Sequence, residues 1–180
     1  MRVFFAIEFE QRVREYLQEI QQQAKKHCQG GNFTRVDNFH LTLRFMGEQS
    51  KEQIANLTKV LEDTSKVNKP FSLSLQNIGR YERGNKCILW AGISRITALN
   101  QLYSSLSQNL CSIGYQNEDR PYSPHITLAR ETRIEDFQRM AENLNQKPVQ
   151  FEVNSVSLME SARVDNVLRY LPVAVAPLRE

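Results

Sequence analysis

The 180-residue sequence contains little cysteine, and the cysteines it has follow no structural pattern. Cys28, Cys87 and Cys111 are an odd number, lie far apart and include no C-x-x-C pair. A disulfide framework or a zinc ribbon needs paired or closely spaced cysteines, so this spacing excludes both. Widely separated thiols are typical of a reduced, cytoplasmic protein.

Long apolar runs are also missing. The first seven residues are apolar apart from Arg2, but Glu8 and Glu10 follow so closely that a signal peptide is excluded. The most apolar later stretch, residues 167–178, contains one arginine and two prolines and cannot span a bilayer. We therefore expect a protein without a membrane segment, located in the cytoplasm.

Neither a strong charge excess nor a metal motif is present. The formal charge of +3 is compatible with an anionic substrate but is too small to indicate wrapping of duplex DNA. The three histidines form neither H-x-x-x-H nor H-E-x-x-H, no carboxylate cluster accompanies them, and there is no Walker A loop. We expect neither a metal ion nor a cofactor.

What the sequence does contain is a short histidine motif that occurs twice. Residues 40–43 read His-Leu-Thr-Leu and residues 125–128 read His-Ile-Thr-Leu, and we call them the first and second tetrad. Side chains alternate between the two faces of a strand, so the histidine and threonine of each tetrad share one face. The aliphatic residues anchor the opposite face. One tetrad alone would be weak evidence for a site, whereas two in matching positions are far more specific.

The order of the expected elements repeats as well. Each half reads strand–helix–strand–helix–strand, and the tetrads, in the second strand of each half, are 85 positions apart. The same offset pairs Phe5 with Trp90 in the opening strands and predicts equivalent packing roles for these two residues. We expect strands at about 2–8, 39–46, 71–78, 87–93, 150–158 and 167–175 and around the second tetrad, and helices at about 11–28 and 95–113 and after capping boxes at Ser50 and Thr132.

These patterns predict an α+β fold with two pseudo-symmetric lobes. Each lobe would be a mainly antiparallel sheet backed by two helices, with a central cleft between the lobes. We interpret residues 1–180 as a single bilobal domain, with a first repeat at about 1–81, a second at about 86–161 and a C-terminal strand at about 166–176. A near two-fold axis would bring one histidine to each side of the cleft.

Two opposed histidines suit a reaction that needs an acid and a base on opposite sides. Histidine is the side chain whose ordinary pKa, roughly 6.5, lies near neutrality, so one imidazole can be neutral while the other is protonated. In-line displacement at phosphorus has this geometry. Thr42 and Thr127 could donate hydrogen bonds to the phosphate oxygens. Arg44 continues the face of the first tetrad by parity, and Arg130 lies just beyond the second tetrad, where we expect a helix to start.

The residues around both tetrads resemble the motifs of a known family. Residues 40–48, HLTLRFMGE, and residues 124–130, PHITLAR, resemble the two signatures of the two-histidine (2H) phosphoesterases. Within that superfamily they are most similar to the RNA 2′,3′-cyclic phosphodiesterases, historically called 2′-5′ RNA ligases. The opening residues 2–7, RVFFAI, and the approach to the second tetrad at 120–124, RPYSP, are also similar to that group.

The resemblance implies a metal-independent hydrolase that converts a 2′,3′-cyclic phosphate into a 2′-phosphomonoester. By the same resemblance, His40 is the proton donor to the 3′ leaving oxygen and His125 is the proton acceptor that activates water. Thr42 and Thr127 would hold the phosphate with help from Arg130. The residues themselves leave the order of acid and base open, because the two tetrads are nearly equivalent.

Several alternatives concern the substrate. The implied partners are RNA ends or small nucleotide cyclic phosphates, with tRNA fragments among the candidates, bound by a monomer. The chain could instead act as a 2′-5′ RNA ligase, act on a different cyclic nucleotide, or be a non-catalytic RNA-end binding module. We expect the loops at 80–86 and 117–120 to set substrate choice. Candidates for stacking on a terminal base are Phe4 or Phe5, Phe45 and Tyr122, for each of which burial in the core is the alternative.

Overall fold

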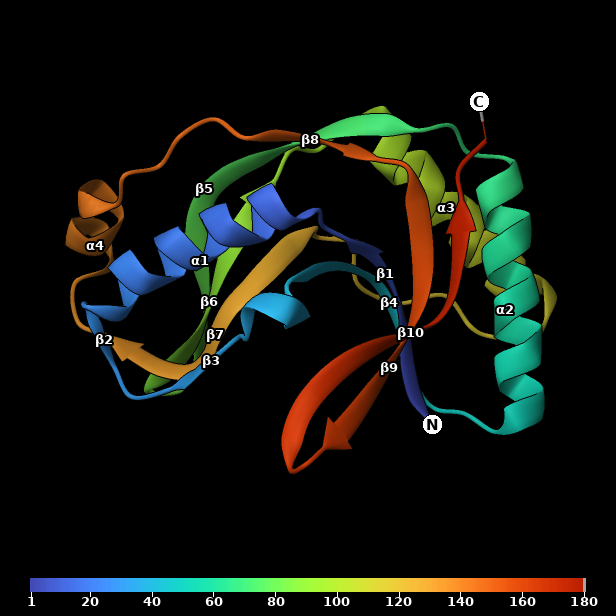
Figure 1. The fold of residues 1–180 in the computed structure, drawn as a ribbon, viewed down its shortest axis with the longest axis horizontal. Coiled ribbons are helices and arrows are strands. Elements are labelled where there is room, and N and C mark those ends of the chain that lie inside the picture. Colours follow the sequence, from blue (N-terminus) through green and yellow to red (C-terminus); the bar gives the residue numbers. More distant parts are fainter. Residues whose placement is uncertain (180) are drawn as a thin grey trace.

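The computed structural model describes residues 1–179 and contains two antiparallel sheets and four α-helices (Figure 1). The helices are α1 (Gln11–Lys25), α2 (Lys51–Lys66), α3 (Thr97–Ser112) and α4 (Phe137–Asn143), with a short 3₁₀ helix, η1, at Val36–Asn38. The strands are β1 (Arg2–Glu8), β2 (Cys28–Gln29), β3 (Asn32–Phe33), β4 (His40–Glu48), β5 (Phe71–Arg83), β6 (Lys86–Ile93), β7 (His125–Ile134), β8 (Gln150–Val153), β9 (Ser155–Val164) and β10 (Val167–Pro177).

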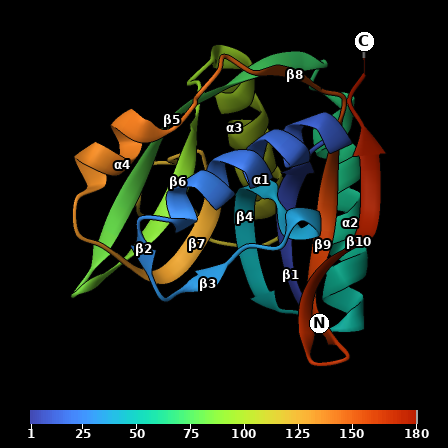
Figure 2. The same ribbon diagram turned by 60° about the vertical axis from the view of Figure 1, so that its left-hand side comes forward.

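The two sheets form two lobes. The smaller sheet has the order β10-β9-β1-β4, and the larger has the order β2-β7-β6-β5-β8, with β3 also pairing with β7. Figures 1 and 2 show α1 and α4 beside the larger sheet and α2 and α3 beside the smaller one. The α+β fold class expected from the sequence is therefore confirmed, with two helices for each sheet.

Each sheet combines strands from both halves of the sequence. Strand β5 ends the first expected repeat but pairs with β6, whereas β9 lies in the second half and pairs with β1. The expected strand at 150–158 is in fact two strands that separate at Asn154: β8 pairs with β5 in the larger sheet and β9 joins the smaller one. The sheets are thus tied together by exchanged strands, and the repeat boundaries remain a prediction.

The aliphatic residues of the tetrads anchor their strands in the core, as the alternation predicted. Leu41, Leu43, Ile126 and Leu128 are each at most 3% exposed, and the apolar stripe of α1 packs into the same core. Full burial of one such side chain stabilises the fold by about 1.5–3 kcal/mol. The aliphatic face therefore fixes each tetrad strand and leaves its polar face available to the cleft.

The two expected capping boxes have different outcomes. Ser50 caps α2, and its side chain and that of Gln53 bond reciprocally to each other's backbone, which confirms the first box. The second is wrong, because β7 continues through Thr132 to Ile134 and the short helix α4 begins only at Phe137. Thr132 is fully buried and donates to the Gly30 carbonyl instead, so long-range packing overrides the local capping signal. Within residues 1–179, no helix is long and apolar enough to cross a membrane.

Candidate active site

Both tetrad strands carry an irregularity at the same place. In the smaller sheet, Ala6 pairs with Thr42 but Phe5 pairs with Arg44, so Leu43 is left out of the register. In the larger sheet, Trp90 pairs with Thr127 but Leu89 pairs with Ala129, so Leu128 is left out in the same way. A bulge reverses the side-chain alternation that follows it.

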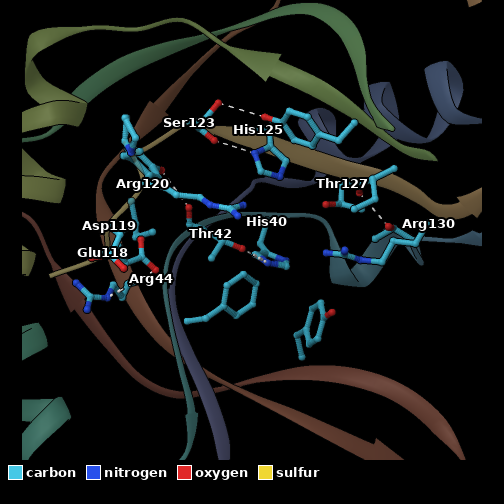
Figure 3. A pocket seen from close by; sticks show the side chains of 18 of the residues that line it. His40, Thr42, Arg44, Glu118, Asp119, Arg120, Ser123, His125, Thr127 and Arg130 are labelled. Carbon is cyan, nitrogen blue, oxygen red and sulfur yellow. Dashed lines mark hydrogen bonds and ion pairs between the residues drawn. The ribbon is translucent and has the colours of Figure 1, made fainter. Parts of the chain in front are cut away.

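The bulges decide how the residues beyond the tetrads are placed in the cleft. Arg44 was expected beside His40 by parity, but it follows the bulge and is only 7% exposed. It lines the cleft at the end where it bonds the Gln116 carbonyl near Glu118, away from the histidines (Figure 3). The next residue along β4 is Phe45, 60% exposed and lining the cleft. Arg130 occupies the equivalent position on β7 and lines the cleft as expected, although it lies within a strand and not at a helix start. The cleft thus carries an aromatic ring beyond the first tetrad and a positively charged side chain beyond the second.

The two tetrads line one cleft of about 860 Å³ between the sheets. Strands β4 and β7 approach each other there but belong to different sheets. All five expected site residues lie in this cleft, and Figure 3 shows the two imidazoles on either side of one space, with Arg130 extending toward His40. The five are His40, Thr42, His125, Thr127 and Arg130.

Each imidazole is held in the same way. Nδ1 of His40 bonds the Asn38 carbonyl at 2.7 Å, and Nδ1 of His125 bonds the Ser123 carbonyl at 2.8 Å. A carbonyl oxygen only accepts, so Nδ1 carries a proton and the neutral ring offers Nε2 as an acceptor. Nε2 of His40 lies 2.9 Å from the Thr42 hydroxyl oxygen. Both histidines are therefore set up to gain or lose a proton at Nε2.

Aromatic rings flank both imidazoles. Tyr170 meets His40 edge-to-face at a centroid separation of 5.0 Å, and Tyr81 meets His125 edge-to-face at 5.2 Å. Phe4 also packs against His40 at 4.8 Å. These rings restrict the rotation of both histidines.

The expected equivalence of Phe5 and Trp90 is wrong by one residue. Ala6 and Trp90 are the residues opposite the two tetrad threonines, so the strands align with an offset of 84. A shift of one residue in a strand moves a side chain to the other face. Phe5 is accordingly fully buried, whereas Trp90 lies 6.2 Å from the ring of His125, above Gly79, where a Cβ atom would come within 2.2 Å of the indole.

The candidate stacking residues differ in how exposed their rings are. Phe4 is only 2% exposed, and Phe5 is fully buried in the core. Tyr122 stacks on Tyr103 with centroids 4.2 Å apart. Phe45 is the one candidate with a largely exposed ring in the cleft. Its ring is therefore the one free to meet a base.

Burial lowers the pKa of His40 from its ordinary 6.5 to about 4. The hydrogen bond from Nδ1 to the Asn38 carbonyl favours the protonated ring and opposes this shift, while the positive charges of Arg130 and His125 add to it. In the free protein His40 is therefore neutral at neutral pH.

This low pKa predicts acid-sensitive folding. The unfolded chain binds a proton at His40 near pH 6.5, whereas the folded chain binds it only near pH 4. The contribution of neutral His40 to the free energy of unfolding is therefore fully present above pH 6.5 and is lost as pH falls toward 4. The loss in the free energy of unfolding amounts to up to about 3 kcal/mol. Denaturant unfolding between pH 4 and 7 should show this slope, and His40→Asn should reduce it. His27→Asn is the matched control, and an equal reduction there would contradict the assignment.

Several residues that shape the site carried no signal in the sequence. Asn38 and Ser123 contribute backbone carbonyls, so their side-chain types give no hint of the role, although both lie two residues before a tetrad histidine. Tyr81 and Tyr170 come from strands that are distant in sequence from the tetrads. Residues 1–179 contain no group of three His, Cys, Asp or Glu side chains arranged to hold a metal ion.

Two antiparallel sheets that present a pair of His-x-Thr-x motifs to one cleft define a 2H phosphoesterase architecture. Residues 9–165 match the family model described as the 2′-5′ RNA ligase superfamily. The chain therefore belongs to the 2′-5′ RNA ligase superfamily.

Individual relatives agree with this assignment. The chain is 33% identical over 133 residues to the RNA 2′,3′-cyclic phosphodiesterase of Escherichia coli K12, covering 72% of each sequence. It is 26% identical over 163 residues to the protein of the same name from Thermotoga maritima, covering 89% of this chain and 87% of the relative. Among solved structures, E. coli LigT complexed with 3′-AMP superposes with a TM-score of 0.77 at 27% identity, covering 99% of this chain and 98% of that one.

Proposed function

We propose that this protein hydrolyses RNA 2′,3′-cyclic phosphate ends to 2′-phosphomonoesters by metal-independent acid–base catalysis. The observation that carries the proposal is the pair of imidazoles with the same Nδ1 anchoring, each beside a threonine on the same strand face, in one cleft. The names of the relatives support this substrate class. Phe45 offers an exposed ring for the terminal base.

In the proposed reaction, Nε2 of His125 takes a proton from water as the water oxygen attacks phosphorus. The new P–O bond forms opposite the bond to the 3′ oxygen, which breaks, and the leaving oxygen takes a proton from Nε2 of His40. The product carries a 2′-phosphomonoester and a 3′ hydroxyl. Thr42 and Thr127 donate hydrogen bonds to the non-bridging oxygens, where the charge of the transition state develops.

The donor role requires His40 to be protonated in the complex, although its pKa is about 4 in the free protein. A bound phosphate supplies the negative charge that the free cleft lacks, and it also offsets the positive charges of Arg130 and His125. An opposite charge within about 4–6 Å raises a histidine pKa. Substrate binding is thus proposed to bring a proton to His40.

The proposed partners are RNA ends or small nucleotide cyclic phosphates, including tRNA fragments, bound by a cytoplasmic monomer. Ligation through a 2′-5′ bond would use the same groups in reverse. A panel of a cyclic-phosphate oligonucleotide, a cyclic mononucleotide, a 2′-5′ dinucleotide and a pair of joinable RNA halves separates these activities by their products. A 2′-phosphomonoester from the oligonucleotide supports the proposal. Tight binding without any product would support an RNA-end binding module instead.

Arg130 allows a sharper test of phosphate stabilisation. We expect Arg130→Gln to lower kcat/KM for the cyclic phosphate by about 10²-fold, the loss typical of removing one preorganised donor to developing charge. Arg133→Gln is the matched control, because Arg133 is exposed on the same strand but does not line the cleft. Steady-state kinetics of the two variants give the comparison, and equal kcat/KM values would contradict the role of Arg130.

A further inference from the structure

The carbonyl groups of the two tetrad threonines are both bonded by side-chain hydroxyls at the bulges. Thr34 donates from Oγ1 to the Thr127 carbonyl at 2.9 Å, and Tyr122 donates from its phenol to the Thr42 carbonyl at 3.0 Å. In each strand this carbonyl lies just before the residue left out of the register. The hydroxyls therefore hold the two strands at the bulges beyond which Phe45 and Arg130 face the cleft.

The two donors are arranged reciprocally along the chain. Thr34 holds the second tetrad and lies six residues before His40, the histidine of the first. Tyr122 holds the first tetrad and lies three residues before His125, the histidine of the second. Each histidine is thus joined by a short length of chain to a hydrogen bond on the opposite tetrad. We call Thr34 and Tyr122, each with the short length of chain that joins it to a histidine, the two tethers. Because β4 and β7 lie in different sheets, the tethers connect the two tetrad strands across the cleft.

Each tether is itself firmly placed. The Thr34 amide donates to the Leu128 carbonyl at 2.9 Å, and Gln21, only 3% exposed on α1, donates to the carbonyls of both Leu128 and Thr34. Tyr122 is held by its parallel stacking on Tyr103, with an interplanar angle of 6°. Burial raises the pKa of the Tyr122 phenol, so the hydroxyl keeps its proton and remains a donor.

We infer that Thr34 and Tyr122 are positioning residues that fix the separation of the two histidines across the cleft. The inference rests on the proposed function, because in-line displacement requires the acid and the base at a set distance on either side of phosphorus. A misplacement of about 1 Å can cost roughly 10²-fold in rate. Neither hydroxyl needs to touch the substrate to act in this way.

The test compares Thr34→Val and Tyr122→Phe, which remove only the hydroxyls, with matched controls elsewhere. Thr58→Val removes a threonine bond to the Ile54 carbonyl in α2, and Tyr16→Phe removes a tyrosine bond to the Lys147 carbonyl. We expect kcat to fall about tenfold in each tether variant, with KM changed less than about twofold, and to stay at the wild-type value in both controls. Either tether alone still restrains the cleft, so the double variant should lose more than the product of the single losses.

A second readout needs no substrate. The chain has three histidines, so their imidazole signals can be followed by NMR, with His27 as an internal reference. In the double variant we expect the imidazole chemical shifts of His40 and His125 to change, because their surroundings move, while those of His27 do not. If wild-type protein fails to hydrolyse cyclic phosphates, the proposed function fails, and the NMR comparison alone decides about the tethers. Wild-type kcat and unchanged imidazole chemical shifts in the tether variants, with a loss of melting temperature only, would overturn the inference.

Discussion

Replacing either His40 or His125 by alanine is expected to lower kcat for a 2′,3′-cyclic phosphate by at least about 10²-fold. General acid–base assistance contributes roughly 10²–10⁴ for each group, and each ring here presents Nε2 to the same cleft. Removing one group leaves either the water unactivated or the leaving oxygen unprotonated. Rates measured at substrate saturation separate this loss from any change in binding.

His27→Ala is the matched control for both variants, because His27 lies near the end of α1 and does not line the cleft. Its kcat should equal that of the wild type. The double variant His40→Ala, His125→Ala should be little slower than the worse single variant, since the two groups act in one concerted step. Retention of wild-type kcat after loss of either cleft histidine would contradict acid–base catalysis by the pair.

Substituting sulfur for the bridging 3′ oxygen of the substrate should restore activity to His40→Ala but not to His125→Ala. A thiol has a pKa of about 8.5, far below that of an alcohol, so a thiolate leaves without a proton donor. The deficit of His40→Ala should therefore shrink from at least about 10²-fold to less than about tenfold. Trapping the released thiol with a chromogenic reagent follows the reaction.

This substrate also decides the order of acid and base. The low pKa of His40 in the free protein would suit a base, whereas the family resemblance makes His40 the donor. Rescue of His125→Ala in place of His40→Ala would reverse the two roles and leave the chemistry of the pair intact. Rescue of neither variant would show that leaving-group protonation limits neither of them.

Local patterns were sufficient to predict the positions of most elements. The alternation around the tetrads placed their aliphatic residues in the core, where Leu41 and Ile126 are fully buried. The capping box at Ser50 started α2 at the expected residue. These features depend on neighbours within a few positions, so the sequence contains the information directly. The five candidate site residues could be named for the same reason, because four of them belong to the repeated tetrads.

The parts that could not be predicted depend on pairing between distant strands. The bulges at Leu43 and Leu128 exist only in the register with β1 and β6, and they explain why Arg44 is buried while Phe45 and Arg130 are exposed in the cleft. The one-residue error that paired Phe5 with Trp90 has the same origin, since alignment by sequence offset cannot locate a shift in register.

Hydrolysis of an oligonucleotide 2′,3′-cyclic phosphate in ¹⁸O-water with excess EDTA tests the central claim most directly. The two-histidine mechanism predicts undiminished turnover, with one ¹⁸O atom in the 2′-phosphomonoester and none in the 3′ hydroxyl, because water attacks phosphorus and the P–O3′ bond breaks. Mass spectrometry of the product and of its dephosphorylated form locates the label. Turnover that ceases with EDTA and returns with a divalent metal, or label in the 3′ hydroxyl, would contradict it.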